Sequence, residues 1–215
     1  NEGISTEHLQ DYMQMEFYWA YADYDELMAM TEKLYQQIIQ NVTGELKTTY
    51  DGKEIDWSGS WPKVRYFDLF QDKTGLDLNT VSDDDLKKYA NAEHIKFEAS
   101  HGRGRIIDLI FKKKIRSNLI QPCFLINPPV EIEPLAKKDP VNPKEVQRMQ
   151  IVAAGTELGK GFSELNDPLD QKARFESQMK LRESGDAEAQ MMDEDFVEAL
   201  EYGMPPAAGF GLSER

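Results

Sequence analysis

Cysteine and histidine are scarce in this chain of 215 residues. With one cysteine and three histidines, the chain can form neither an internal disulfide nor a cysteine-rich zinc site. Cys123 lies in the apolar run Pro122–Ile126, which indicates a buried structural thiol more than a nucleophile. No segment resembles the serine-containing turn of a hydrolase. Nucleophilic and zinc-dependent catalysis are therefore poorly supported, and this cysteine usage is typical of a protein of the reducing cytoplasm.

Long apolar runs and excess positive charge are also missing. No stretch of about eighteen apolar residues is present, and the first residues do not form a signal peptide, so we expect neither a membrane span nor export. The formal charge of −14 argues against binding nucleic acid through the charge of the whole protein. The one concentrated basic stretch, residues 103–116, is either a solvated helix face or a local patch that faces RNA.

The spacing of apolar residues predicts an α+β fold. Capping residues, such as Asp23, and apolar residues at helical spacing indicate helices over residues 24–40, 82–90, 104–117, 168–184 and 193–203. The first of these helices is expected to face the core with a stripe that runs from Leu27 to Ile38. Alternation and short apolar runs indicate strands over residues 12–20, 47–50, 53–57, 124–126, 148–154 and 157–164. Asp51-Gly52 is a two-residue hairpin turn, and residues 137–143 are predicted to be a loop. Because strands and helices do not alternate regularly, we expect one domain with an antiparallel sheet flanked by helices.

Two of the predicted strands carry polar side chains on one face. In the strand over residues 12–20, an apolar face expected in the core consists of Met13, Met15, Phe17 and Trp19. The opposite face, either the wall of a polar ligand pocket or a half-solvated surface, consists of Tyr12, Gln14, Glu16 and Tyr18. In the strand over residues 157–164, Lys160, Phe162 and Glu164 share one face. Glu157 joins them only if a β-bulge re-aims it, and we predict a bulge at Gly159.

These residues suggest the chemistry of a ligand. The chain places carboxylates on strands beside aromatic side chains, and it ends in an arginine: Glu2, Glu16, Glu157, Glu164, Tyr12, Tyr18, Phe162 and Arg215. Carboxylates around an aromatic slot suit a cationic ligand together with a divalent metal. Oxygen ligands with few nitrogens favour Mg²⁺, which usually arrives with the phosphates of a substrate.

Several motifs, in order, resemble the class II lysyl-tRNA synthetases. Asn1-Glu-Gly-Ile-Ser5, His8, Met15-Glu-Phe-Tyr18 and Ala20–Tyr24 resemble motif 2 and the strand after it. The match continues through Leu119–Pro122, Pro134–Lys137, Gly161–Pro168, Asp193–Phe196 and Ala199–Pro206. Gly209–Arg215 then resembles the start of motif 3. The resemblance covers essentially the whole chain, and the order and spacing of the motifs make coincidence improbable.

The resemblance implies a class II synthetase catalytic domain. Such a domain joins L-lysine to ATP, giving lysyl-adenylate and pyrophosphate, and then transfers lysine to tRNA(Lys) for protein biosynthesis. Chemistry in this family is mostly positioning and charge stabilisation. Mg²⁺ bound with ATP, a cytoplasmic location and a homodimer of the full-length protein are implied as well.

The resemblance also assigns roles to individual residues. Glu2 and Arg215 match catalytic residues that contact ATP, and His8 lies beside the triphosphate. Tyr12 falls where the family usually has a phenylalanine stacked on adenine. The residues that match the lysine-binding set are Glu16, Tyr18, Lys160, Phe162 and Glu164, with Tyr18 and Glu164 nearest the ε-ammonium. Glu157 matches a magnesium ligand.

Three positions depart from the family pattern. Gln150 replaces a second metal-binding glutamate, which weakens or removes one magnesium site. Lys160 replaces an asparagine that faces the amino acid, and its ammonium would repel a lysine substrate unless it pairs with the α-carboxylate or points outward. Motif 3 is one residue shorter than usual, although Glu214 keeps the acidic position before the arginine.

Parts of the family's catalytic machinery are not in the 215 residues. The α-phosphate arginine of motif 2 would directly precede Asn1, and motif 1, the anticodon-binding OB domain and the helix after motif 3 are missing. We therefore expect a partial catalytic domain, over residues 1–215, that activates lysine poorly by itself. Two alternatives stay open: a synthetase paralogue that lysylates a protein such as elongation factor P, and a non-catalytic binding module derived from a synthetase.

Overall fold

A six-stranded sheet forms the centre of the molecule. The computed structural model describes residues 11–186 and 189–213. The strand order is β1-β8-β7-β6-β5-β4, and every neighbouring pair in this described sheet is antiparallel except β4–β5. The bounds are β1 (Gln14–Ala20), β4 (Lys63–Arg65), β5 (Cys123–Ile126), β6 (Arg148–Ala153), β7 (Thr156–Ser163) and β8 (Ala207–Ser213). The predicted α+β class is confirmed, with one parallel pair added at the β4 edge.

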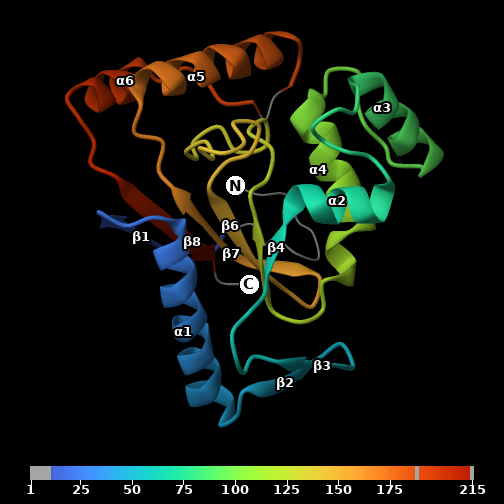
Figure 1. Ribbon diagram of the computed structural model, residues 1–215, viewed down its shortest axis with the longest axis vertical. Helices are drawn as coiled ribbons and strands as arrows, with labels where there is room; N and C mark the ends of the chain where they lie inside the picture. Colours follow the sequence, from blue (N-terminus) through green and yellow to red (C-terminus); the bar gives the residue numbers. More distant parts are fainter. Residues whose placement is uncertain (1–10, 187–188, 214–215) are drawn as a thin grey trace.

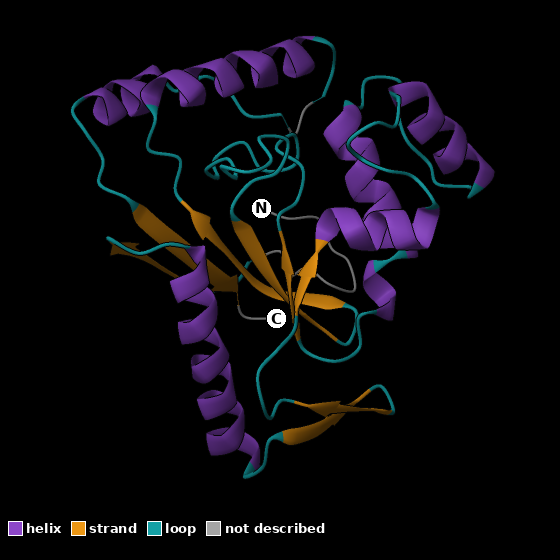
Figure 2. Cartoon of the chain, viewed as in Figure 1, coloured by secondary structure: helices purple, strands orange, loops and turns teal. Residues whose placement is uncertain are grey.

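Helices surround the sheet on several sides (Figures 1 and 2). They are α1 (Tyr24–Thr43), α2 (Tyr66–Thr74), α3 (Asp83–Ala92), α4 (Arg103–Lys114), the 3₁₀ turn η1 (Arg116–Asn118), α5 (Pro168–Glu183) and α6 (Glu194–Glu201). The five predicted helices are confirmed, whereas α2, β4 and β8 were not predicted. Among the described residues, none of these helices has both the length and the apolar character needed to cross a membrane.

The predicted hairpin is confirmed as a separate two-stranded sheet. β2 (Lys47–Tyr50) pairs with β3 (Lys53–Asp56) in antiparallel register, and the pair lies at one end of the molecule (Figure 1). Asp51 and Gly52 have φ angles of 48° and 71°, the left-handed values that a type I′ turn requires. An aspartate followed by glycine therefore indicated this turn correctly.

Helix α1 begins where its capping residue predicted. The side chain of Asp23 accepts hydrogen bonds from the backbone N–H groups of Asp25 and Glu26, and the side chain of Glu26 accepts one from the backbone N–H of Asp23, which completes a capping box. Leu27, Met28 and Thr31 of α1 are buried. Ile38, which we expected on the same buried stripe, is 46% exposed. That expectation is wrong because, in this turn of α1, the adjacent Ile39 and not Ile38 packs against the core.

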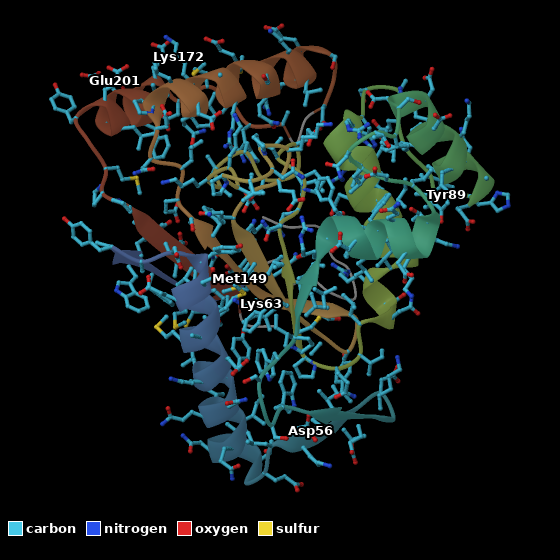
Figure 3. The ribbon with its side chains drawn as sticks, in the orientation of Figure 1. Asp56, Lys63, Tyr89, Met149, Lys172 and Glu201 are labelled. Atoms are coloured by element: carbon cyan, nitrogen blue, oxygen red, sulfur yellow. The ribbon has the colours of Figure 1, made fainter. Side chains whose placement is uncertain are left out.

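Two apolar clusters hold the sheet, one on each face. Alternate residues of β6 separate between them: Met149 and Ile151 pack in the cluster beneath α1, whereas Val152 packs in the cluster with α2, α3 and α4. Met149 lies between the sheet and α1 (Figure 3). The first cluster includes Leu27, Trp57, Trp61 and Phe210, and the second includes Phe70, Ile107, Ile110 and Cys123. Burial raises the pKa of the Cys123 thiol to about 11, which fits the predicted structural role.

Strand β1 differs from its prediction. It begins at Gln14 and not at Tyr12, and the face expected in the core is largely exposed, with exposures of 42% for Met15 and 41% for Trp19. Only Phe17 is covered, by packing against Phe210 with ring centroids 5.8 Å apart. The physical reason is position, since β1 lies at the end of the described sheet and α1 covers the strands next to it.

The basic stretch over residues 103–116 forms all of α4 and reaches the first residue of η1. Its apolar side is buried, and its cations form ion pairs: Arg103 with Asp83, Lys112 with Asp108, and Lys114 with Glu93. Partner carboxylates thus neutralise part of the positive charge. These contacts favour the interpretation as a solvated helix face over that of an RNA-facing patch.

Candidate functional site

Within the described residues, no helix packs on one face of the sheet where β7, β8 and β1 meet. Helices α2 to α4 cover this face only toward β5, through Cys123, Leu125 and Val152. The strand register places on it the residues Glu16, Tyr18, Arg148, Gln150, Glu157, Lys160 and Phe162. Six of the predicted site residues are therefore brought together here: Glu16, Tyr18, Gln150, Glu157, Lys160 and Phe162. A seventh, Glu164, follows directly after β7.

A β-bulge re-aims Glu157, as predicted, although its extra residue is Leu158 and not the neighbouring Gly159. Ile151 pairs with Gly159 while the next residue, Val152, pairs with Glu157, so Leu158 is the extra residue of the bulge. Without it, Glu157 would point toward α1. With it, Glu157 accepts a hydrogen bond from the side-chain amide of Gln150 on the neighbouring strand.

Glycines form the floor of the site. Gly209 of β8 pairs with Tyr18 and with Phe162, and a Cβ atom at Gly209 would clash with Oε1 of Glu164 and lie 2.9 Å from the Tyr18 ring. The carboxylate of Glu164 therefore rests directly on the β8 backbone. The alternation of Gly209, Phe210 and Gly211 in a strand is the sequence signal for such a close approach.

Glu164 has the most perturbed carboxyl group of the site. Burial, followed by the charges of Glu133 and Glu16, raises its pKa to about 7 from the ordinary 4.5. Its Oε1 atom is buried and has no hydrogen-bond partner within the described part of the chain. A buried carboxylate without a partner costs free energy, so its position is explained best by a ligand that brings a positive charge or a hydrogen-bond donor.

Glu16 and Tyr18 form the outer wall of the site on β1. The Tyr18 hydroxyl donates a short hydrogen bond to Oε1 of Glu16. This bond, with burial and the charges of Glu16 and Glu164, raises the pKa of Tyr18 to about 12. Tyr18 therefore stays protonated at neutral pH, and both side chains remain exposed enough to meet a ligand.

Sequence reasoning missed two charged residues of the site, Glu133 and Arg148. Glu133 lies in the loop between β5 and β6, and its side chain is 9% exposed. Its Oε2 atom lies 3.5 Å from Nε of Arg148 and 3.3 Å from Nζ of Lys160. No pattern in the sequence could have placed Glu133 here, because the loop has no periodicity. Arg148 opens the predicted strand 148–154 on the same face as Gln150, and that spacing was a usable signal.

The loop that carries Glu133 is fixed by a buried arginine of α5. The guanidinium of Arg174 is 8% exposed, donates to the carbonyl oxygen of Ala136 at 2.6 Å, and forms an ion pair with Asp170. Further donations reach the carbonyls of Glu133 and Pro134. Ala136 in turn forms a β-bridge with Glu164. Figure 2 shows this irregular segment between the sheet and α5, so the loop attaches one wall of the site to that helix.

The residues present fit a magnesium ion only with help from a ligand. Glu157 offers one carboxylate, and its neighbour Gln150 donates an amide N–H to it. No group of three or more His, Cys, Asp or Glu side chains is placed to hold a metal among the described residues. A single carboxylate with phosphate oxygens is a usual environment for Mg²⁺, so Glu157 suits a metal that arrives with a nucleotide.

Four predicted ATP-binding residues cannot be assembled into a complete site. Glu2, His8 and Arg215 lie outside the described residues. Tyr12 is described, but it precedes β1 and is 41% exposed. The nucleotide contacts of these residues therefore stay predictions.

Comparisons with known proteins agree with the resemblance. The model of the family "tRNA synthetases class II (D, K and N)" matches residues 1–214. A lysine–tRNA ligase of Bacillus subtilis is 44% identical over 213 residues, which are 99% of this chain and 43% of the relative. Lysine–tRNA ligases of Staphylococcus saprophyticus and Nostoc punctiforme are 42% and 44% identical, and the matches cover 43% and 38% of their lengths. The chain thus spans about two fifths of the length of these relatives.

Proposed function

The chain belongs to the class II tRNA synthetase family (D, K and N), and on that premise we propose that it is part of the catalytic domain of a lysine–tRNA ligase. In this function the protein activates L-lysine with ATP, releases pyrophosphate and transfers the lysyl group to tRNA(Lys) in the cytoplasm. Support comes from relatives named lysine–tRNA ligase, which are more than 40% identical over nearly the whole chain. The full-length protein is proposed to act as a homodimer.

The observation that carries the lysine assignment is the buried oxygen of Glu164. It has no hydrogen-bond partner in the described chain, the charges of Glu133 and Glu16 act on its carboxyl group, and its own charge acts on the Tyr18 hydroxyl. An ε-ammonium has three donors and a positive charge, so it satisfies Glu164 and offsets the repulsion among the carboxylates. Phe162, on the same face between Lys160 and Glu164, is proposed to contact the aliphatic stem of the bound lysine.

The nucleotide is proposed to bind toward Glu157, at the other end of the same face. Mg²⁺, when bound with ATP, would neutralise phosphate charge, and Glu157 would be its ligand from this chain, with Gln150 beside it. The site residues orient the substrates: Glu164 holds the ammonium of lysine so that its α-carboxylate lies toward the nucleotide. Attack of that carboxylate on the α-phosphorus then gives lysyl-adenylate, with pyrophosphate as the leaving group.

Calorimetry on the 215-residue chain tests the lysine assignment. We expect L-lysine to bind at pH 7.5, and Glu164→Gln to weaken that binding by about 10- to 100-fold, because a hydrogen bond between charged groups contributes about 1.5–3 kcal/mol. Glu54→Gln, on the distant hairpin and exposed, is the matched control and should bind normally. Norleucine, which lacks the ε-ammonium, should not bind. Equal affinity for lysine and norleucine would rule out the proposal.

A further inference from the structure

Two carboxylates of the site flank Phe162 on opposite sides. Arg148 pairs with Phe162 across β6, and Glu133 lies against Arg148 at 3.5 Å. Gly209 pairs with Phe162 across β8, and Glu164 lies against Gly209. Glu133 is therefore on the β6 side of Phe162, and Glu164 is on the β8 side.

Lys160 is positioned to reach either carboxylate. It lies two residues before Phe162 on the same face of β7, a separation of about 7 Å along the strand, and the four-carbon stem of a lysine covers most of that distance. Its ammonium carries the same chemical group as the ligand in the proposed function. An unpaired Glu164 would therefore attract the ammonium of Lys160 as well as that of free lysine.

The structure shows that Lys160 pairs with Glu133. Its Nζ lies 3.3 Å from Oε2 of Glu133, while Oε1 of Glu164 has no partner among the described residues. Glu133 is also fixed from behind, because Arg174 binds the backbone carbonyls of its loop and Arg148 lies against its carboxylate. A fixed and nearly buried carboxylate is well suited to hold a flexible, half-exposed ammonium.

We propose that Glu133 is a positioning residue that holds the ammonium of Lys160 away from Glu164 and so keeps Glu164 available for the ammonium of the substrate. The proposal rests on the proposed function for the identity of that substrate. Glu133 acts through Lys160 and does not itself contact the bound amino acid. This pairing with Glu133 also explains how the site tolerates a lysine at position 160, because the charge of Lys160 is neutralised within the site.

Titration of Glu164 without any ligand tests this positioning role. The chain would be labelled with ¹³C at the glutamate carboxyls, and the pKa of Glu164 measured by NMR in the wild type, Glu133→Gln, Lys160→Met and the double variant. The other titratable and charged groups near Glu164 are Glu16, Tyr18 and, through Glu133, Arg148. All four proteins keep these groups unchanged.

The expected result is strong coupling between the two substitutions. With Glu133 in place, Lys160→Met should raise the Glu164 pKa by clearly less than it does without Glu133, because the ammonium then lies at Glu133. In the Glu133→Gln background, where Lys160 is free to pair with Glu164, the same change should raise that pKa by about 1, the usual effect of a close opposite charge. Equal shifts in the two backgrounds would mean that Lys160 acts only through distant charge, and would overturn the proposal.

Lysine affinity gives a second measurement of the same coupling. Glu133→Gln should weaken lysine binding about tenfold, and adding Lys160→Met should restore it. Lys47→Met, which removes a positive charge on the distant hairpin, should restore nothing. If Glu133→Gln fails to fold, Glu133→Asp can replace it. This variant keeps the charge beside Arg148 but no longer reaches Lys160. Lys160 is then free to pair with Glu164, so the pKa of Glu164 should fall.

The two readouts separate the two proposals. Coupled titrations without any lysine binding would contradict the proposed function and leave the positioning role of Glu133 intact. Lysine binding that depends on Glu164, together with additive titrations, would contradict the positioning role alone.

Discussion

The two faces of strand β7 show how one segment serves both packing and binding. Toward α1 it presents Gly159 and Gly161, which lie tightly against Phe210 and Leu27, and Ser163, whose hydroxyl accepts a hydrogen bond from the N–H of Tyr24. Toward the site it presents Lys160 and Phe162, with Glu164 just beyond the strand. The first face is tightly packed, and its one hydroxyl described above is hydrogen-bonded. The second collects carboxylates and leaves one buried oxygen without a partner in the described chain.

This difference predicts that the two faces respond differently to substitution. Changes on the α1 face should reduce the free energy of unfolding without a specific effect on ligand affinity. Changes on the site face should alter ligand affinity and leave stability nearly constant. Stability and binding measured together on each variant therefore test the comparison.

The largest effect is expected from Phe210→Ala on the α1 face. Phe210 is 2% exposed and contacts Phe17, so its truncation leaves a cavity that should cost about 3–5 kcal/mol of unfolding free energy. Chemical denaturation would measure the loss. Ile38→Ala, on the exposed side of α1, is the control and should change stability by no more than about 0.5 kcal/mol. A cost below about 1 kcal/mol for Phe210→Ala would contradict the packing described for this face.

A matched pair of glycine substitutions, one on each face of the sheet, separates the effects on stability from those on binding. A Cβ atom at Gly161 would lie 2.6 Å from the carbonyl oxygen of Gly209 and 3.1 Å from Leu27, so Gly161→Ala should destabilise the fold by about 1–3 kcal/mol. A Cβ atom at Gly209 would displace Glu164 and the Tyr18 ring. Gly209→Ala should therefore weaken lysine binding at least tenfold with a smaller loss of stability. If both variants lose stability and affinity in the same proportion, the two faces do not have the separate roles described here.

A smaller effect is expected from Tyr18→Phe. The substitution removes the hydroxyl that hydrogen-bonds Glu16 and keeps the ring over Gly209. Because one exposed hydrogen bond contributes about 0.5–1.5 kcal/mol, lysine affinity should fall about 2- to 10-fold, and the thermal midpoint should stay within about 1 °C. Tyr50→Phe, on the hairpin and 64% exposed, should change neither property. If Tyr18→Phe binds lysine as tightly as the wild type, the Tyr18 hydroxyl does not contribute to lysine binding.

The sequence predicted the fold well where local chemistry determines it. The Asp23 cap, the Asp51-Gly52 turn, the strand 124–126 and the bulge beside Gly159 all depend on nearby residues, and all are confirmed. Helix α2 was not predicted, because its N-cap position before Tyr66 holds Arg65, which is not one of the usual capping residue types. The exposure of Met15 and Trp19 depends on how far α1 extends across the sheet, which periodicity does not reveal.

The site was predictable to a similar extent. Alternation along β1 and β7 placed Glu16, Tyr18, Lys160 and Phe162 on their faces, and the register then brought these faces together. Glu133 was missed because an irregular loop supplies it, and only tertiary contacts through Arg174 determine where that loop lies. Position 160 illustrates the consequence. A lysine that looks repulsive in the sequence has its counter-ion in a segment that the sequence does not connect with it.

Binding of the lysine ammonium by the Glu164 carboxylate is tested most directly by the pH dependence of lysine binding. The pKa of Glu164 is raised to about 7, so the free chain must release a proton from Glu164 before the ionised carboxylate binds the cation. Lysine affinity should therefore rise about tenfold per pH unit between about 5.5 and 7 and level off above that range. Glu164→Gln should bind weakly, with no such slope. A flat pH profile for the wild-type chain, or an unchanged slope in Glu164→Gln, would show that Glu164 does not bind the lysine ammonium.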